Sequence, residues 1–217
     1  MAENFRLSRI DASNIGDHWY LQETDECYYL FEYTSHKNFS FSQTNNLISN
    51  LKKKPGGANR PGYHYKGRAI QECAQHLAAT IDPAWLQTST LVPVPSSKAR
   101  GHPDFDDRIA RICRSIRPVP PLDVRELVRQ TQSLVAAHEV GDGQRPKPQD
   151  IRAVYEIDET LTNPVPLRIG IFDDVLTNGT HYRAMHAILS ERFPGVPIVG
   201  IFIARRVLPN TFESEPA

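Results

Sequence analysis

Several short stretches of the chain consist almost entirely of apolar, mostly β-branched residues, with little alternation of apolar and polar positions. This pattern is typical of strands that are buried on both faces, as in a parallel sheet. The clearest stretches are residues 90–95, 167–172 and 198–204; residues 154–157 form a weaker one, and residues 122–128 fit a short strand or a turn. The first stretch must end at its prolines, because proline donates no hydrogen bond to a sheet.

Between these stretches, apolar residues recur every three or four positions, which is the spacing of one helical face. The spacing predicts helices over residues 65–80, 104–116 and 180–193, the last ended by Pro194 and Gly195, and a shorter helix over residues 45–51. Strands and helices therefore alternate after residue 88. Apolar strands joined by helices predict an α/β protein with an open, mainly parallel sheet and helices on both faces.

The first third of the chain has a different character. Aromatic residues are dense at positions 19–21 and 27–33, on either side of a polar stretch at 23–26, which predicts a β-hairpin. A segment rich in proline and glycine follows helix 45–51 and is typical of an exposed connector. We therefore expect an aromatic-rich, β-containing appendage with its connector over residues 1–62 and a main domain over residues 63–217.

Composition limits the possible functions without selecting one. The chain has 217 residues and a formal net charge of zero, so its overall charge does not point to nucleic acid or an anionic membrane. Its three cysteines, Cys27, Cys73 and Cys113, are too few for a zinc site made of cysteine alone. No apolar run approaches the roughly 20 residues of a membrane helix, and the first residues lack the apolar core of a secretory signal. We expect a cytoplasmic protein with reduced cysteines and no membrane partner.

A group of polar residues separates the apolar stretch 167–172 from the helix that follows it. Ligands bind at the carboxyl ends of strands in open α/β sheets, and helix N-termini offer unpaired N–H groups to a phosphate. The residue types predict sugar-hydroxyl acceptors at Asp173 and Asp174, and a phosphate-binding loop at Thr177, Asn178, Gly179 and Thr180. The alternative is an ordinary strand-to-helix turn with Thr180 as N-cap, which leaves two adjacent acids unexplained.

This segment resembles the motif that binds phosphoribosyl diphosphate (PRPP) in type I phosphoribosyltransferases, where two acids and a Thr/Gly-rich loop follow an apolar strand. The resemblance implies that Asp173 and Asp174 bind the ribose at the catalytic centre and that residues 177–180 bind the 5′-phosphate. Asn178 stands where that family usually has threonine. His181 stands where it usually has a small or apolar residue.

Over residues 65–205 the chain resembles the ComF-like branch of this family, the competence-associated proteins. The resemblance is carried by Tyr65-Lys-Gly67 before a helix, by Leu91-Val-Pro-Val-Pro95 before a basic loop, and by Leu127-Val-Arg129 at the start of a hood. Proteins of that branch commonly begin with a four-cysteine zinc ribbon. This sequence has the aromatic-rich segment in its place.

A second anion site is predicted in the loop after Pro95. Ser97, Lys98 and Arg100 combine a hydroxyl group with two cations at the same sheet edge, although a solvated surface turn explains them equally well. The resemblance implies that this loop binds the pyrophosphate of PRPP together with Mg²⁺, for which no direct protein ligand is predicted. It also implies that the polar residues 140–150, predicted as a loop, form a hood that excludes water.

Two other surfaces are candidate partner sites. Residues 52–54, all lysine, and residues 60–66 mix cations with aromatic rings, as in surfaces that bind single-stranded nucleic acid. A solvated linker is the simpler interpretation of that composition. The aromatic residues 19–33 suit either a protein partner or a small core.

Two functions from different classes follow. The first is a Mg²⁺-dependent glycosyltransferase of nucleotide metabolism, which transfers phosphoribosyl from PRPP to an acceptor and releases pyrophosphate. The second is a non-catalytic module that binds PRPP, a nucleotide, a protein or nucleic acid in a DNA-associated process such as uptake or defence. The sequence contains no evident general acid or base, which is compatible with both, and it does not identify the acceptor.

Overall fold

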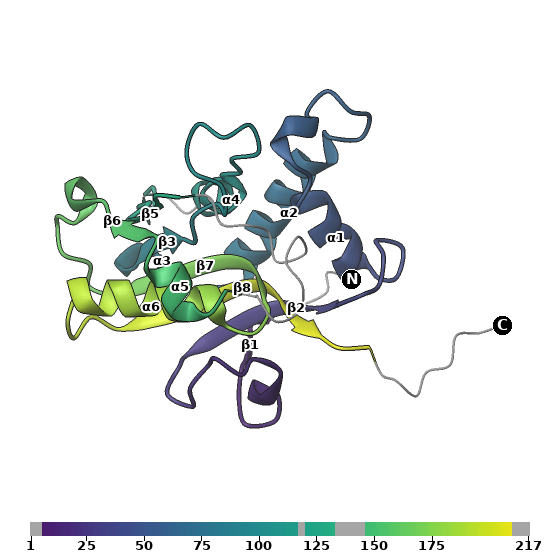
Figure 1. The fold of residues 1–217 in the computed structure, drawn as a ribbon. Coiled ribbons are helices and arrows are strands. Elements are labelled where there is room, and N and C mark those ends of the chain that lie inside the picture. The colour runs from purple at the N-terminus through teal and green to yellow at the C-terminus, as the bar shows by residue number, and fades with distance from the viewer. Residues whose placement is uncertain (1–5, 117–119, 133–145, 210–217) are drawn as a thin grey trace.

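A six-stranded, mostly parallel sheet organises the chain (Figure 1). The computed structural model describes residues 6–116, 120–132 and 146–209. The strand order is β1 (Ser8–Arg9), β2 (Cys27–Thr34), β8 (Ile198–Val207), β7 (Ile169–Leu176), β3 (Thr90–Pro93) and β4 (Asp123–Val124). Only β1 is antiparallel to its neighbour among these strands. The α/β class and the strands predicted after residue 88 are confirmed.

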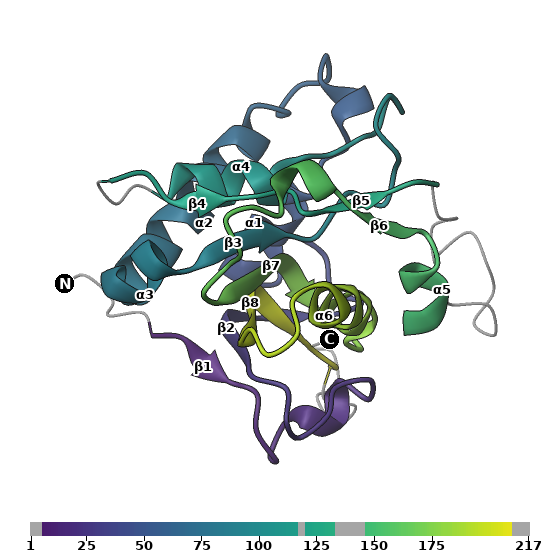
Figure 2. The same ribbon diagram turned by 90° about the vertical axis from the view of Figure 1, so that its left-hand side faces the viewer.

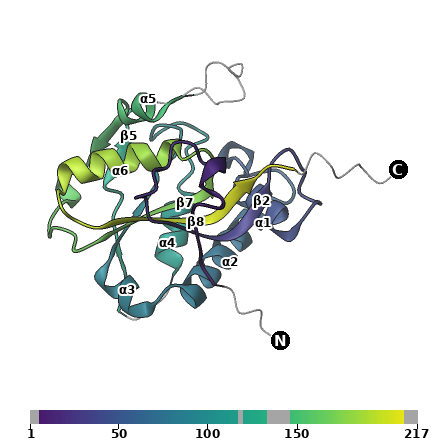
Figure 3. The same cartoon turned by 90° about the horizontal axis from the view of Figure 1, so that it is seen from below.

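Helices cover both faces of the sheet (Figure 3). One face carries α5 (Pro148–Arg152) and α6 (Thr180–Arg192); the other carries α1 (Gln43–Leu51), α2 (Tyr65–Thr80), α3 (Pro83–Thr88) and α4 (Arg108–Ser115). Successive strand residues point to opposite faces, so Leu91 packs with the α1–α4 layer and Val92 with α6. None of the helices described here is long and apolar enough to cross a membrane.

A short antiparallel ribbon flanks the main sheet. It consists of β5 (Val128–Gln130) and β6 (Tyr155–Ile157), and Figure 2 shows it beside α5 and α6. The remaining regular elements of the described chain are single 3-10 turns: η1 (Ile15–Asp17), η2 (Pro55–Gly57) and η4 (Glu159–Leu161). The ribbon approaches the first turn of α6 through Tyr155, which makes it part of the region discussed below.

The predicted hairpin over residues 19–33 is wrong. Residues 19–21 form no strand, and β2 pairs instead with β1 on one side and with β8 on the other, in register Tyr29↔Phe202. Pairing inside the sheet buries Cys27, Tyr29 and Leu30 of the aromatic run, and the residues alone do not distinguish such a strand from a hairpin strand. The first 62 residues thus supply two strands and a helix to the common sheet and core, so residue 62 coincides with no break in either.

Three other boundaries differ from expectation. Strand β7 continues through both acids to Leu176 instead of ending before them, because its pairing with β8 extends to Leu176↔Arg205. Helix α4 begins at Arg108 rather than at residue 104, after a turn in which the Phe105 amide donates to the His102 carbonyl. The predicted loop 140–150 lies partly outside the described residues, and its described end enters α5.

Gly200 offers a test of core packing. A Cβ at this position of β8 would lie 2.8 Å from the rings of Phe202 and Tyr182 and 3.0 Å from the Cys27 sulfur, all of them buried. We expect Gly200→Ala to lower the free energy of unfolding by about 1–3 kcal/mol, measured by urea denaturation. Gly67→Ala is the matched control, because nothing lies within 4 Å of its Cβ and alanine favours the helix. Equal stability of the two variants would contradict this view of the core.

Candidate functional site

Parallel pairing places the two predicted anion loops at the same edge of the sheet. Pro93 of β3 is opposite Phe172 of β7, and the Val94 amide donates to the Phe172 carbonyl at 2.9 Å. The carboxyl ends of the two strands are therefore adjacent, so residues 96–101 and 177–180 leave the sheet from neighbouring positions. Such an edge is where open α/β sheets bind ligands.

The loop 177–180 enters α6 through a left-handed glycine. Gly179 is the N-cap residue with φ 87°, and a Cβ there would approach the Leu21 side chain to 3.0 Å. Thr180 is therefore not the N-cap but the first helical residue. The side-chain oxygen of Asn178 accepts from the Thr180 hydroxyl at 2.6 Å and from the Thr180 amide at 3.3 Å. The amide side chain that departs from the family pattern thus occupies part of the space in which a phosphate would meet this helix end.

Residues 18–25 of the N-terminal segment bond to the loop 177–180 and to α6. The buried His18 imidazole bonds through Nδ1 to the Thr177 carbonyl oxygen, and the Tyr20 amide donates to the Asn178 carbonyl at 3.0 Å. Burial lowers the pKa of His18, so a neutral ring with its proton on Nδ1 fits this bond. Further along, Arg183 of α6 pairs with the buried Asp25 at 2.7 Å. These contacts could not be predicted from the sequence, because they join residues more than 150 positions apart.

The two adjacent acids occupy different environments. Asp174 is buried among cations: Arg108 Nη2 lies 2.6 Å from its Oδ2, and Lys52 Nζ lies 3.1 Å from its Oδ1. Burial alone would raise the pKa of Asp174, but Arg108 and Lys52 outweigh burial and lower it. For Asp173, burial and the Asp174 charge raise the pKa to about 7. One strand thus presents a fixed carboxylate and a carboxyl group that exchanges its proton near neutral pH.

Asp173 lies on the α6 side of β7, as the two-residue period of the strand requires. There Tyr155 of β6 shares a hydrogen bond of 3.1 Å between its hydroxyl and His181 Nδ1. Burial lowers the pKa of His181 to about 4, whereas burial followed by the Asp173 charge raises the pKa of Tyr155. The neutral Tyr155–His181 pair therefore adds no positive charge beside Asp173 at neutral pH.

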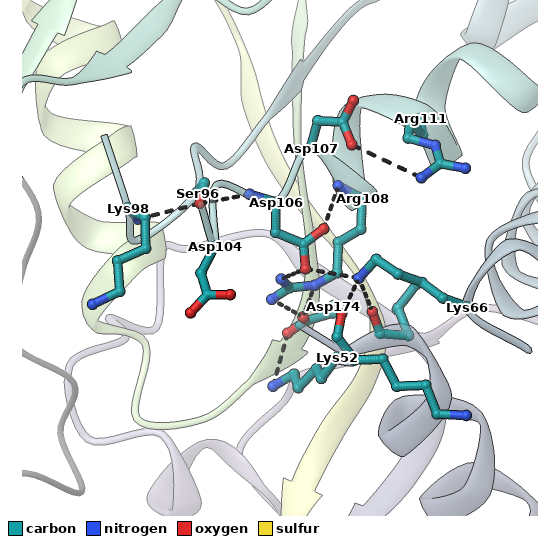
Figure 4. Close-up of polar contacts among 12 residues, drawn as sticks. Lys52, Lys66, Ser96, Lys98, Asp104, Asp106, Asp107, Arg108, Arg111 and Asp174 are labelled. Carbon is teal, nitrogen blue, oxygen red and sulfur yellow. Dashed lines mark hydrogen bonds and ion pairs between the residues drawn. The ribbon is translucent and has the colours of Figure 1, made fainter. Parts of the chain in front are cut away.

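A buried ionic network reaches Asp174 from the opposite face (Figure 4). Arg108 Nη1 lies 2.8 Å from Asp106 Oδ2, and that same oxygen lies 2.7 Å from Lys66 Nζ. The Lys66 ammonium also donates to the carbonyls of Leu51 at 2.6 Å and of Lys53 at 2.9 Å, so three acceptors surround it. The predicted surface role of Lys66 is therefore wrong: the residue is 1% exposed. Its spacing ahead of Ala69, Ile70 and Cys73 on the buried face of α2 was the available signal.

The second loop borders a cavity of about 370 Å³ between α4 and the β5 strand. Lys98 and Arg100 line it together with apolar side chains such as Phe105, Ile109 and Val128, whereas Asp173 and residues 177–180 are not among its lining residues. Arg100 pairs with Glu126 at 2.8 Å and lies 5.6 Å from the Phe105 ring.

Ser97 and Lys98 differ in whether they are already bonded to other parts of the protein. The Ser97 carbonyl accepts from the Gln130 side chain at 2.7 Å. Within the described part of the chain, the Lys98 ammonium forms no ion pair, unlike that of Lys52. Of the predicted pyrophosphate residues, Lys98 is therefore the cation best placed to meet a ligand.

The predicted cationic and aromatic surface is only partly available. Lys53 donates to the Gly62 carbonyl at 2.7 Å and lies 5.0 Å from the Tyr65 ring, while Lys52 pairs with Asp174. Exposed members of the run include Lys54, Arg60, His64 and Tyr65.

Comparison with known proteins adds no family assignment. No protein-family model matches the chain, and no curated protein matches it significantly. In the described segments, no three side chains of His, Cys, Asp or Glu come together as a metal-binding group. The resemblance to phosphoribosyltransferases therefore stays a prediction from the motif.

Lys66 provides a test of the ionic network. We expect Lys66→Met to lower the free energy of unfolding by about 3–5 kcal/mol, because it removes one partner of a buried ion pair and leaves two carbonyls without their donor. Urea denaturation at neutral pH measures the change. Arg111→Gln is the control: Arg111 lies 4.0 Å from Asp107 at the surface, and its loss should change stability by no more than about 0.5 kcal/mol. A similar small change in both variants would rule out a stabilising role for the network.

The raised pKa of Asp173 predicts a pH-dependent gain in stability for Asp173→Asn. The folded protein retains a proton that the unfolded chain releases near pH 4, so wild type loses stability as pH rises from about 4 to about 7. The asparagine variant lacks this loss. The difference in free energy of unfolding, variant minus wild type, should therefore increase across this window and then level off. Urea denaturation of both proteins at pH 4.5, 6 and 7.5 measures this difference. A difference that stays the same at all three pH values would show that the pKa of Asp173 is not raised.

Proposed function

We propose that this protein binds a 5-phosphorylated ribose, with PRPP as the leading candidate, at the carboxyl ends of β7 and β3. The observation that carries the proposal is the left-handed Gly179, which links the end of β7, the strand that carries Asp173 and Asp174, to the N-terminus of α6. Glycine is required here because of its positive φ and because Leu21 packs where a Cβ would lie, and the resulting turn starts α6 at Thr180. The adjacent loop with Lys98 adds a second anion-binding element at the same edge.

Each part of the ligand has a matching group. The amide and hydroxyl of Thr180 and the hydroxyl of Thr177 suit the 5′-phosphate once the Asn178 side chain turns away from Thr180. Asp173 is the acid that suits the ribose hydroxyls, because Asp174 already accepts from Arg108 and Lys52. Lys98 suits the diphosphate.

Phosphoribosyl transfer is the activity we propose for the bound ligand. The bond between ribose C1 and the diphosphate oxygen breaks, a bond from C1 to the acceptor forms, and pyrophosphate leaves with the bonding electrons. The transition state has oxocarbenium character, as in glycosyl transfer generally. Asp173 would orient the sugar beside this positive centre, and Lys98 would stabilise the charge that develops on the leaving group.

Mg²⁺ is a suitable partner for the diphosphate. Mg²⁺ commonly binds through one or two carboxylates plus substrate phosphates. Asp173 is the adjacent carboxylate, and among the described residues it forms no ion pair. When bound, the ion would neutralise the leaving pyrophosphate, and its retention would depend on the diphosphate.

A non-catalytic ribose-phosphate binder is the second candidate. Two features favour it: Asp174 is engaged by cations, and Asn178 partly satisfies the end of α6. Both features leave fewer free groups to stabilise a transition state, but they do not remove the groups that would bind the ligand. The two candidates differ in turnover and share the same ligand.

Calorimetric titration with PRPP and Mg²⁺ tests the site. We expect wild type to bind, and we expect Gly179→Ala and Asp173→Asn each to weaken binding by about tenfold or more, because a Cβ at φ 87° strains the loop and the amide removes a charged acceptor. Gly195→Ala is the matched control, since Gly195 also has positive φ (81°) but lies in the turn after α6. Equal binding by all four proteins, or none by wild type, would exclude this site. Pyrophosphate release with a panel of acceptors then separates transferase from binder.

A further inference from the structure

Arg108 contacts two carboxylates that belong to different parts of the candidate site. Its Nε donates to Asp174 Oδ2 at 2.8 Å, and its Nη1 donates to Asp106 Oδ2 at 2.8 Å. Asp174 lies on β7, immediately after the acid proposed for the ribose. Asp106 ends the loop that begins after β3 and carries Lys98. One guanidinium thus joins the two strand ends.

Asp106 in turn fixes the start of its own loop. Its amide donates to the Ser96 hydroxyl oxygen at 3.1 Å, and the same oxygen accepts from the Lys98 amide at 3.2 Å. A displacement of Asp106 would therefore move the backbone that carries Lys98. Figure 4 shows this chain of contacts from Lys98 through Ser96 and Asp106 to Arg108 and Asp174.

The geometry requires a planar fork rather than a point charge. Two nitrogens of Arg108, Nε and Nη2, are directed at Asp174, and the third is directed at Asp106. A lysine ammonium has the same charge, but it cannot hold two carboxylates in this fixed arrangement. The side chain is also largely shielded from solvent, so removing it would leave two buried carboxylates without this partner.

We propose that Arg108 is a positioning residue, which holds the Lys98 loop in register with the end of β7 so that one ligand can span both. Asp174 then serves as the anchor of Arg108, and Asp173 is the acid that meets the sugar. The inference rests on the proposed function. It adds that recognition of the diphosphate depends on a residue that touches no part of the ligand.

The experiment compares two ligands on the full-length chain. PRPP spans both loops, whereas ribose 5-phosphate needs only the loop 177–180 and Asp173. We expect Arg108→Lys to weaken PRPP binding by about tenfold or more and to change ribose 5-phosphate binding much less, measured by calorimetry. Arg111→Lys, one turn further along the exposed side of α4, is the control and should change neither. A loss of equal size for both ligands would overturn the proposal in favour of a purely structural ion pair.

A double-mutant cycle tests the anchor. If Arg108 acts through Asp174, the combined variant Arg108→Lys/Asp174→Asn should bind PRPP no more weakly than the worse single variant. Additive losses would show that the two residues act separately.

Hydrogen–deuterium exchange provides a test without ligand. Arg108→Lys should speed amide exchange in residues 96–106 and at residues 173–176, and Arg111→Lys should not. Unchanged amide exchange rates in both segments would contradict the positioning role of Arg108 even if PRPP binds. Failure of the wild-type protein to bind either ligand would contradict the proposed function. The exchange rates would still decide whether Arg108 couples the two strand ends.

Discussion

The buried pairing of Arg108 with Asp106 and Asp174 is the constraint on which this end of the molecule depends. Removing these charges from water is expensive, and it is offset only if every partner is in place. Arg108 begins α4, Asp174 lies on β7, and Lys66 on α2 completes the set through Asp106. The packing of these elements is therefore fixed by electrostatics as well as by the apolar core.

The same network determines which groups remain available to a ligand. Lys52, Lys66 and Arg108 carry three positive charges against the two of Asp106 and Asp174, so the cluster retains one positive charge. Asp173 lies next to this excess, and burial and the Asp174 charge raise its pKa to about 7, so it gains or loses its proton near neutral pH. The cluster therefore carries a net positive charge, even though the chain as a whole is neutral.

The local pattern of apolar residues was sufficient to predict most helices and strands, but not to predict which strands and side chains pair with one another. Helix 65–80 and the strands after residue 88 were predictable because apolar spacing directly reflects which faces are buried. The aromatic strand at Cys27–Thr34 was found, but its partner was not, because pairing with β8 joins residues about 170 positions apart and leaves no local mark. The apolar pattern ends before the two acids and therefore predicted them after the strand. Because β7 continues through both, they face opposite sides of the sheet. The ionic partners of Asp174 could not be predicted, since four separate segments supply the network.

The contrast between Asp173 and Asp174 shows how identical side chains acquire different roles from position alone. A strand places successive residues on opposite faces, so two adjacent acids necessarily enter different surroundings. One face offers Arg108 and Lys52, which lower the pKa of Asp174 and favour its ionised form; the other offers Tyr155 and a neutral His181, which contribute no compensating charge. The charge on Asp174 then acts back on Asp173 and favours its protonated form. A sugar hydroxyl at this edge would therefore meet a carboxyl group whose charge depends on pH and on the cations that accompany the ligand, with the fixed charge of Asp174 one residue away.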